Sequence, residues 1–390
     1  MLPPVLISIF WLLLQFVVGA VVAFIAVISF LGKSAERKVD TVQGVVRLIL
    51  PTSPQHLATE DVWRLVLIAL LKHILAPIGW TTRLQPEGQG FTLPRIEIHG
   101  QLDITAVDIQ AFREAVALHD DTPKPPDTIS PFFLVALTVP LTIQTLASNS
   151  CPIRPLGAVN TRNVFKIHDP ALCRSPAALR EKKLTYSAVF GGADNSGHRR
   201  KRGVEFCITI DVLFEGKAVL SQELWYMQFL SPSIEPKHVA VPEKAIDSSV
   251  VDSMVHGRTQ SLDIGMDDPR KWAACCKDYN PIHVSKFTAR LLGFRSVIAH
   301  GNHVAALVVE QLATLQPSAK EKVLSKARKS CWHRTEPFTV EVSFARPLLL
   351  PARAEVSWSD DKGYSSKSSF TVSAKDKMCI SGSICALDEK

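Results

Sequence analysis

The stretch Pro131–Ala147 (PFFLVALTVPLTIQTLA) constrains the fold more than any other part of the chain. It has the length of a helix, carries no charged side chain, and contains one helix breaker, Pro140, which predicts a kink. A helix that is apolar on all sides must be buried, as it is when a β-sheet wraps around it. Two alternating, β-branched runs follow at Val204–Leu213 and Ala218–Leu230, and their short connection predicts a long hairpin. We therefore expect an α+β unit over residues 91–230.

The second half of the chain repeats this order of elements without repeating the sequence. Ile298–Gln311 is a strongly apolar helix candidate, and four strand candidates follow it. The strand candidates are Phe338–Phe344, Ala352–Trp358, Ser369–Ala374 and Met378–Leu387. A chain of 390 residues suits about two domains. The proline- and charge-rich stretch 231–262 is the expected linker, and residues 263–390 are the expected second unit.

The N-terminus is a further constraint, because no charged side chain precedes Lys33. The run Val5–Leu31 is apolar apart from Gln15, and as a helix it would be roughly 40 Å long at about 1.5 Å per residue. We therefore expect residues 1–32 to form an uncleaved transmembrane anchor. A cleaved signal peptide is the alternative, but the run lacks a basic n-region and an Ala-x-Ala-like site.

The charge and the cysteine content indicate on which side of the membrane the chain lies and what kinds of partner it binds. Basic residues follow the apolar run, which by the positive-inside rule places the rest of the chain in the cytosol, with the endoplasmic reticulum as the favoured organelle. The eight cysteines are scattered without a paired framework, as in reduced proteins. The net charge of +7 accompanies no nucleic-acid-binding motif, so we expect a membrane contact and no nucleic-acid partner.

Residues 33–90 are the expected juxtamembrane segment, in which Val62–Trp80 is apolar but too short to cross a membrane. This run could lie flat at the membrane interface, with Trp63 and Trp80 at its ends. It could equally pack as a helix on the globular part. The sequence leaves both alternatives open.

The stretch most informative about chemistry is Lys277–Gly301 (KDYNPIHVSKFTARLLGFRSVIAHG). Asp278 and His283 lie five positions apart on a turn-rich loop, where a carboxylate can orient a water molecule while an imidazole exchanges its proton near neutral pH. Gly301 opens the apolar helix candidate, so its free backbone N–H can polarise a carbonyl whose oxygen gains charge. The pattern predicts an acid/base pair beside an oxyanion donor.

Four motifs follow one another in the second half of the chain. They are DYNPIH from Asp278, FTARLLGF from Phe287, IAHG from Ile298 and VEVSFARPLLLPARAEV from Val340. In this order they resemble the MaoC-like dehydratases, or (R)-specific enoyl-CoA hydratases, over about Met266 to the end. The first unit is similar to the non-catalytic half of members with a double fold. The resemblance implies a tandem (double) hot-dog fold, in which each unit is a curved antiparallel sheet around a central helix.

The resemblance also implies a reaction and the residues for it. Asp278 and His283 would activate water for hydration of trans-2-enoyl thioesters or dehydration of (3R)-3-hydroxyacyl thioesters. Asn280 would hold the loop, the Gly301 N–H would bind the thioester oxygen, and His300 belongs to the IAHG motif. The chemistry needs no metal and no separate cofactor, because coenzyme A or an acyl carrier arrives as part of the thioester substrate.

Other basic residues and histidines in this region have more than one interpretation. Lys286, Arg290 and Arg295 are candidates for binding the nucleotide phosphates of the substrate, although surface charge explains each of them too. His300 and His303 have the spacing of metal ligands on a helix, but no HExxH motif or carboxylate cluster supports a metal site.

Two departures from the family pattern leave the activity open. Lys277 stands where the family usually has glycine, and the helix around Val304–Val309 lacks a serine that many hydratases carry. A catalytically degenerate acyl-thioester or lipid-binding protein and a hot-dog thioesterase are therefore alternatives. In a hydratase the first unit would shape the acyl tunnel and replace the second subunit of a simpler dimer, so we expect a pseudo-dimeric monomer or a homodimer.

Overall fold

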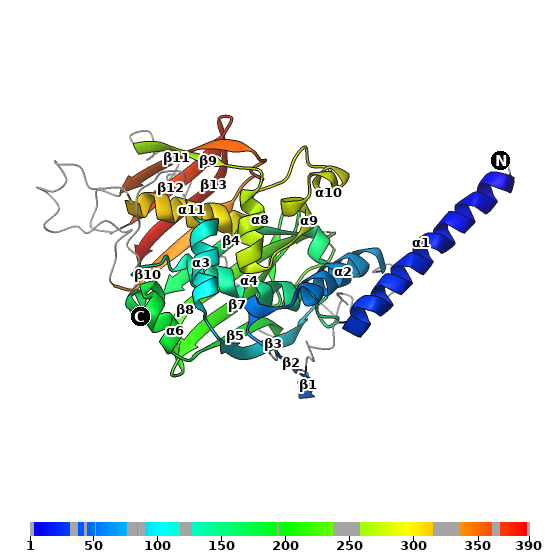
Figure 1. The fold of residues 1–390 in the computed structure, drawn as a ribbon, viewed down its shortest axis with the longest axis horizontal. Helices are drawn as coiled ribbons and strands as arrows, with labels where there is room; N and C mark the ends of the chain where they lie inside the picture. Colours follow the sequence, from blue (N-terminus) through cyan, green and yellow to red (C-terminus); the bar gives the residue numbers. More distant parts are fainter. Residues whose placement is uncertain are drawn as a thin grey trace, which may run out of the picture.

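Two units, each a sheet wrapped around one helix, make up the body of the molecule (Figure 1). The central helices are α4 (Phe132–Ala147) and α11 (Gly301–Thr314). The structure, a computed structural model, describes the following residues of the chain: 4–31, 38–42, 45–50, 52–75, 84, 90–117, 127–192, 195–231, 233–236, 258–314, 336–360 and 367–387. The linker expected at 231–262 therefore lies mostly outside the described residues.

The first unit has five main strands in the order β3-β5-β7-β8-β4. These are β3 (Leu93–Leu102), β4 (Ala158–Ile167), β5 (Leu184–Gly192), β7 (Gly203–Phe214) and β8 (Lys217–Phe229). The expected long hairpin is β7–β8, and the short β6 (His198–Arg200) pairs with β7. Nearly every side chain of α4 is buried. The prediction of a buried apolar helix inside a sheet is confirmed.

The second unit has five strands in the order β9-β11-β12-β13-β10. These are β9 (Arg258–Ile264), β10 (Phe338–Phe344), β11 (Ala352–Asp360), β12 (Ser368–Ala374) and β13 (Lys377–Ala386). In both units the strand that follows the central helix lies at one edge of the five, and the strand that precedes the helix lies at the other. The expected parallel between the halves therefore holds in strand order.

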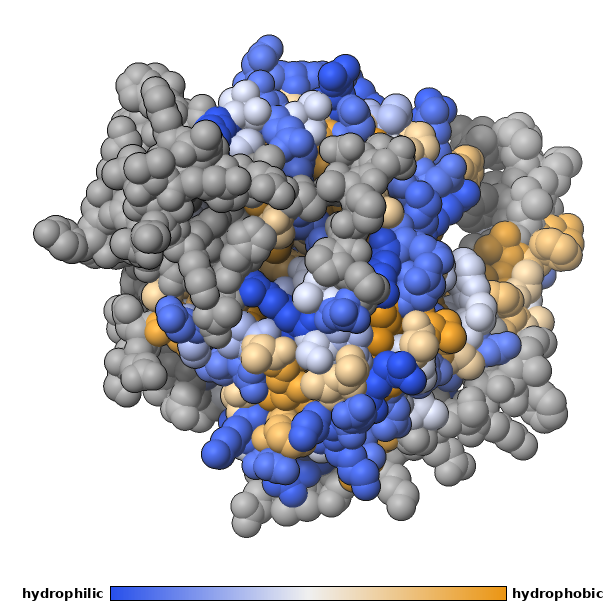
Figure 2. All heavy atoms as spheres, turned by 60° about the vertical axis from the view of Figure 1, so that its left-hand side comes forward, coloured by the Kyte–Doolittle hydropathy of each residue, from blue (hydrophilic) through white to orange (hydrophobic). Residues whose placement is uncertain are grey.

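Among the described strands, one pair joins the sheets of the two units. β4 and β10, the strands that follow the two central helices, pair antiparallel from Phe338 opposite Ile167 to Ser343 opposite Arg162. The pairing makes one continuous sheet of the whole body. Apolar side chains gather inside this sheet, and hydrophilic residues predominate on the face shown in Figure 2.

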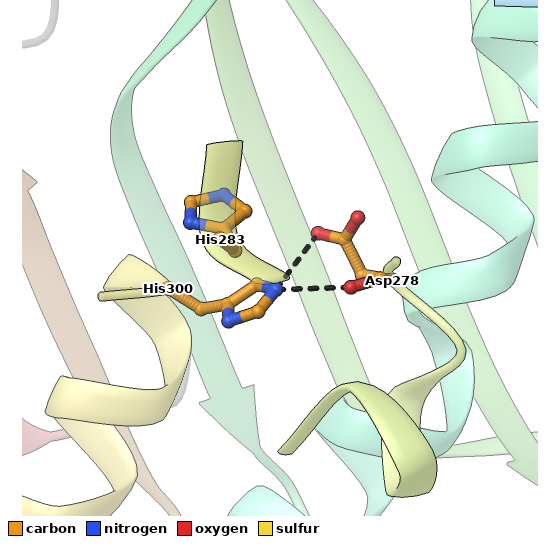
Figure 3. Close-up of side chains that lie close together, drawn as sticks. All are labelled: Asp278, His283 and His300. Atoms are coloured by element: carbon orange, nitrogen blue, oxygen red, sulfur yellow. Dashed lines mark hydrogen bonds and ion pairs between the residues drawn. The ribbon is translucent and has the colours of Figure 1, made fainter. Parts of the chain in front are cut away.

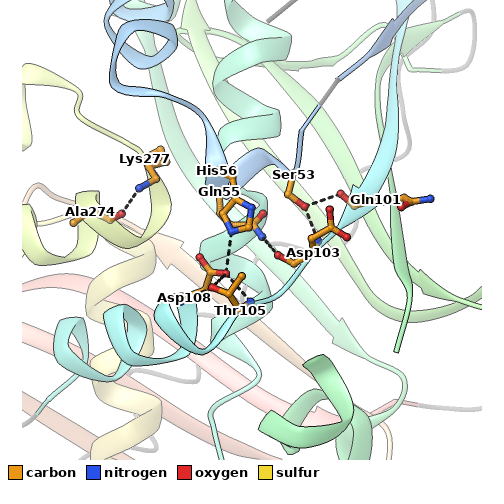
Figure 4. A network of polar contacts seen from close by, with 9 residues as sticks. All are labelled: Ser53, Gln55, His56, Gln101, Asp103, Thr105, Asp108, Ala274 and Lys277. Atoms are coloured by element: carbon orange, nitrogen blue, oxygen red, sulfur yellow. Dashed lines mark hydrogen bonds and ion pairs between the residues drawn. The ribbon is translucent and has the colours of Figure 1, made fainter. Parts of the chain in front are cut away.

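Short helices and turns connect the strands and the central helices. They are α3 (Ala106–Ala115), α5 (Pro170–Arg174), α6 (Pro176–Glu181), α8 (Asp268–Cys276), α9 (Pro281–Val284), α10 (Lys286–Leu291), and the 3-10 turns η1 (Pro54–His56) and η3 (Pro155–Gly157). Among them α3, α8 and η1 pack on α4. A polar network fixes the start of α3: Thr105 and Asp108 form a capping box, and His56 contacts the same carboxylate (Figure 4). The cysteines described here are free thiols, and all but Cys385 are buried.

The N-terminal segment begins with α1 (Pro4–Leu31), where the expected helix does form. Its described part exposes large apolar side chains, including Trp11, Phe16 and Phe24. Within the residues that the structure describes, no helix has the length and apolarity needed to cross a membrane. The transmembrane anchor expected over residues 1–32 is therefore not supported.

The rest of the N-terminal segment joins the first unit. β1 (Lys38–Val42) pairs with β2 (Val45–Ile49), and β2 extends the sheet by running parallel to β3. α2 (Thr59–Leu75) packs on α4, with Lys72 almost fully buried. Its ammonium group donates to the backbone oxygens of Leu146, Ser148 and Cys151 at 2.6, 2.9 and 2.7 Å.

A cation at the C-terminal end of a helix is electrostatically favourable, so Lys72 binds α2 firmly to α4. Of the two alternatives for Val62–Trp80, the described part up to Leu75 packs on the globular body. Trp80 itself lies outside the described residues.

Candidate active site

The loop that carries the candidate residues starts from a left-handed residue, Lys277. Its backbone has φ 57° and ψ 16°, a conformation that glycine adopts most easily. The Lys277 N–H donates to the Ala273 oxygen at 2.7 Å, and the Lys277 side chain donates to the Ala274 oxygen at 2.9 Å (Figure 4). The loop thus has the conformation suited to the glycine that the family usually has, although a lysine is present.

Asn280 fixes the next part of the loop. Its N–H donates to Asp278 Oδ1 at 3.1 Å, and its side-chain oxygen accepts from the Ile282 N–H at 3.4 Å. Asn280 is therefore the N-cap of α9, the helix that carries His283. These contacts suit the expected role of holding the loop.

His283 has a defined tautomer, because its Nδ1 lies 2.7 Å from the backbone oxygen of Ile298. A carbonyl oxygen can only accept, so Nδ1 carries the hydrogen and Nε2 keeps its lone pair. Burial lowers the pKa of His283, and the nearby negative charge of Asp278 acts in the opposite direction. The ring is consequently neutral near pH 7 and can accept a proton at Nε2.

His300, just before α11, points its ring toward Asp278 (Figure 3). Its Nε2 donates to the Asp278 backbone oxygen at 3.0 Å and lies 3.7 Å from Oδ2 of the carboxylate. The ring stacks on that of His283 with centroids 3.9 Å apart. Burial, together with the neighbouring His283 and His303, holds the pKa of His300 well below its usual range. His300 is therefore a neutral hydrogen-bond donor.

The structure brings the three predicted side chains Asp278, His283 and His300 together. A carboxylate oxygen and one ring nitrogen of each histidine lie within 4.8 Å of one another. Two hydrogen bonds of about 2.8 Å can span this distance through one water molecule. The same groups are of the types that bind metal ions, but one nitrogen of each ring already donates to a backbone carbonyl.

Gly301 is the first residue of α11, so its N–H has no acceptor within the helix. The residue lies tightly against the ring of Phe344 in β10, and a Cβ at this position would overlap with that ring. The next residue, Asn302, accepts a hydrogen bond from Asn163 of the first unit at 2.7 Å. Sequence reasoning missed this contact, and no local pattern marks it, because the two asparagines are 139 positions apart.

Tyr226 of β8 is a second residue of the first unit that was not predicted, and it is close enough to Asp278 for the carboxylate charge to act on its hydroxyl. Burial raises the pKa of the Tyr226 hydroxyl, and the charge of Asp278 raises it further. The side chains of Asn160 and Thr142 act in the opposite direction. The hydroxyl therefore stays protonated near neutral pH.

His303 does not belong to the cluster. It is fully buried in α11, its Nε2 donates to the Ala115 oxygen at 2.8 Å, and its ring stacks on Trp272 with centroids 4.9 Å apart. These contacts tie α11 to α3 and α8. They make His303 a packing residue rather than the partner of His300 in a metal site.

The three predicted phosphate-binding residues lie on or next to α10. Lys286 and Arg290 belong to this helix, Arg295 follows it, and all three are exposed. They share this surface with the exposed side chains of Phe287 and Leu291. Their role in substrate binding stays a prediction.

Comparison with known proteins agrees with the motifs and with the fold. The family described as MaoC like domain matches residues 250–328, which include the whole Asp278–Gly301 stretch. A 3-hydroxyacyl-thioester dehydratase X of Mycobacterium tuberculosis is 26% identical over 223 residues, covering 56% of this chain and 65% of that protein. The chain thus spans less than two thirds of the length of this relative.

Solved structures show the same fold. A crystal structure of HtdX from Mycobacterium tuberculosis has a TM-score of 0.52 at 21% identity, covering 74% of this chain and 99% of the other. A MaoC-like dehydratase from Phytophthora capsici has a TM-score of 0.50 at 14% identity, covering 76% and 97%. The expected α+β fold of the hot-dog type is confirmed, and the resemblance of the second unit to MaoC-like dehydratases is confirmed.

Proposed function

We propose that the protein catalyses the reversible hydration of trans-2-enoyl thioesters, or the dehydration of (3R)-3-hydroxyacyl thioesters. The observation that carries the proposal is the geometry at the start of α11. Asp278 and the neutral His283 lie together with His300, which directly precedes Gly301, and the Gly301 N–H has no acceptor in the helix. The similarity of residues 250–328 to MaoC-like domains supports this choice of chemistry.

In the hydration direction, the Asp278 carboxylate orients a water molecule and His283 Nε2 takes a proton as the water oxygen bonds to C3. The C2–C3 double bond gives up its π electrons, and negative charge builds on the thioester oxygen. The Gly301 N–H stabilises this charge. The proton then passes to C2 on the same face, so that H and OH of one water molecule are added and the site returns to its initial state.

The partner of this reaction is an acyl thioester of coenzyme A or of an acyl carrier, and Lys286, Arg290 and Arg295 are the proposed phosphate contacts. The first unit would cover the acyl chain, so one polypeptide would serve as a pseudo-dimer. We expect no metal and no further cofactor to be required.

The test is an assay of the purified full-length protein with trans-2-enoyl-CoA of several chain lengths, followed by loss of absorbance of the conjugated thioester. Asp278→Asn and His283→Ala are each expected to lower kcat by about 10²- to 10⁴-fold, because the first removes the carboxylate that orients the water and the second removes the group that takes up its proton. The matched control is His168→Ala, which removes a histidine that bonds Ser221 on the first-unit sheet and should retain activity.

Two results would contradict the proposal. Wild-type protein that binds enoyl-CoA without converting it would point to the degenerate binding protein. Release of free thiol in place of hydration would point to the thioesterase.

A further inference from the structure

A β-bulge in β4 lies just before Asn163, an asparagine of the first unit that contacts the second unit. The pairing of β4 with β8 shifts between Asn160 and Arg162. On the C-terminal side of the shift, Asn163 and Phe165 point inward with no exposed surface. A bulge of this kind re-aims side chains and is frequent beside active sites.

Asn163 makes one contact in the second unit and leaves one atom unpaired. Its Nδ2 donates to Asn302 Oδ1 at 2.7 Å, whereas its own Oδ1 is buried and has no hydrogen-bond partner among the described residues. A buried amide oxygen without a partner costs about 1–3 kcal/mol. An apolar residue would fill this core position without that cost, so packing alone does not explain an asparagine here.

Asn302 places this contact next to the candidate site. It follows Gly301 directly, and Gly301 follows His300, which bonds the backbone of Asp278. The first turn of α11 is therefore held on two sides, by Asn163 from β4 and by Phe344 from β10. β4 and β10 are also the strands that pair across the unit boundary.

We propose that Asn163 is a positioning residue for the site: through Asn302 it fixes the first turn of α11, and with it the Gly301 N–H. This inference rests on the proposed function for its kinetic consequence. The first unit then contributes to catalysis through a neutral amide close to the point where negative charge develops. A neutral group is required there, because an anion would repel the charge on the thioester oxygen.

The decisive variant is Asn163→Asp, which keeps the shape of the side chain. Asn302 can reverse its amide and donate to the new carboxylate, and an anion at the start of a helix does not destabilise it. The carboxyl group is nevertheless fully buried, so we expect a lower melting temperature, as in the control below. We also expect a fall in kcat of about tenfold or more and a KM within about twofold of wild type, and the fall in kcat is the result that distinguishes a positioning role. A residue with only a structural role would lower the melting temperature and leave the kcat of the folded protein unchanged.

The matched control is Gln222→Glu on the neighbouring strand β8. Gln222 is equally buried, but its amide bonds Thr138 of α4 inside the first unit. The same change of amide to carboxyl there should lower the melting temperature and leave kcat close to wild type.

A second measurement does not depend on turnover. Hydrogen exchange in the first turn of α11, reported by the Val304 N–H that bonds the His300 oxygen at 3.1 Å, should be faster in Asn163→Ala by about tenfold, with the rest of α11 unchanged. Unchanged exchange would overturn the proposal even if the wild type proved inactive. Faster exchange in Asn163→Ala together with an inactive wild type would leave this proposal standing and refute the proposed function alone.

Discussion

The two units have the same strand order but begin their central helices differently. α4 starts with Phe132 and Phe133, which are fully buried and pack edge-on against Phe165 and Phe112. α11 starts with Gly301 and an asparagine. Aromatic rings therefore fill the start of the first helix, while the backbone N–H of the second can meet a ligand. Under the proposed function, the first residues of the helix, and not the strand order that both units share, make the second unit the one suited to chemistry.

The chain segments that precede the two central helices differ as well. Before α11 the chain forms α8, α9 and α10, and the loop between α8 and α9 holds Asp278. Before α4, the described residues 127–131 hold Asp127 and no histidine. An acid/base pair is thus present at one helix start only, as far as the structure describes the two approaches.

The largest effect is expected from Gly301→Ala, which gives α11 a start closer to that of α4. The added methyl group would overlap with the Phe344 ring, so overpacking should cost about 1–3 kcal/mol of stability. Displacing the oxyanion donor should lower kcat by about 10²-fold or more. Enzyme kinetics and thermal unfolding measure the two effects separately.

A smaller side chain at position 344 separates the effect of Gly301→Ala on packing from its effect on catalysis. Phe344→Leu in the Gly301→Ala background is expected to recover stability and part of the activity. Full activity in Gly301→Ala alone would show that the start of α11 is not the oxyanion site.

An effect of intermediate size is expected on the free energy of unfolding at acidic pH, because buried neutral histidines lie in and next to α11. Burial lowers the pKa of His303 to about 4 and that of His300 well below its usual range. Below about pH 6.5 the unfolded chain binds protons that the folded chain does not, so the free energy of unfolding should fall from pH 6.5 toward pH 4.

For His303 this loss is roughly 3 kcal/mol at most, from about 1.4 kcal/mol per pKa unit. His303→Gln can keep the bond to the Ala115 oxygen but takes up no proton, so its unfolding free energy should depend less steeply on pH over this range. Denaturant unfolding at a series of pH values measures the slope. Equal slopes for variant and wild type would assign the acid sensitivity to other groups.

The smallest effect is expected from Lys277→Gly. A non-glycine residue in the left-handed conformation costs about 1 kcal/mol, and the hydrogen bond of the Lys277 side chain to Ala274 offsets part of this. The glycine variant should be more stable by up to about 1 kcal/mol and keep its kinetic constants. A loss of activity would show that the lysine has a role beyond the backbone conformation of the loop.

The sequence predicted elements whose signal is local. The apolar faces of Pro131–Ala147 and the alternation of Val204–Leu230 predicted α4 and the β7–β8 hairpin, and DYNPIH and IAHG marked the residues that meet at the site. It did not predict the contact of Asn163 with Asn302, which depends on a bulge and on pairing between distant strands. Tyr226 was missed for the same reason, because its approach to Asp278 arises from the docking of the two units.

The pairing of β4 with β10 has a consequence for attempts to divide the protein. If the second unit were expressed alone, Phe338–Phe344 would become an open sheet edge with unpaired backbone groups. Such an edge recruits another strand, so the isolated half is expected to associate with a second copy of itself or to aggregate. The pairing of β4 with β10 therefore covers an edge that each unit would otherwise leave open. A cut in the linker that leaves both pieces bound is expected to be tolerated better than removal of either piece.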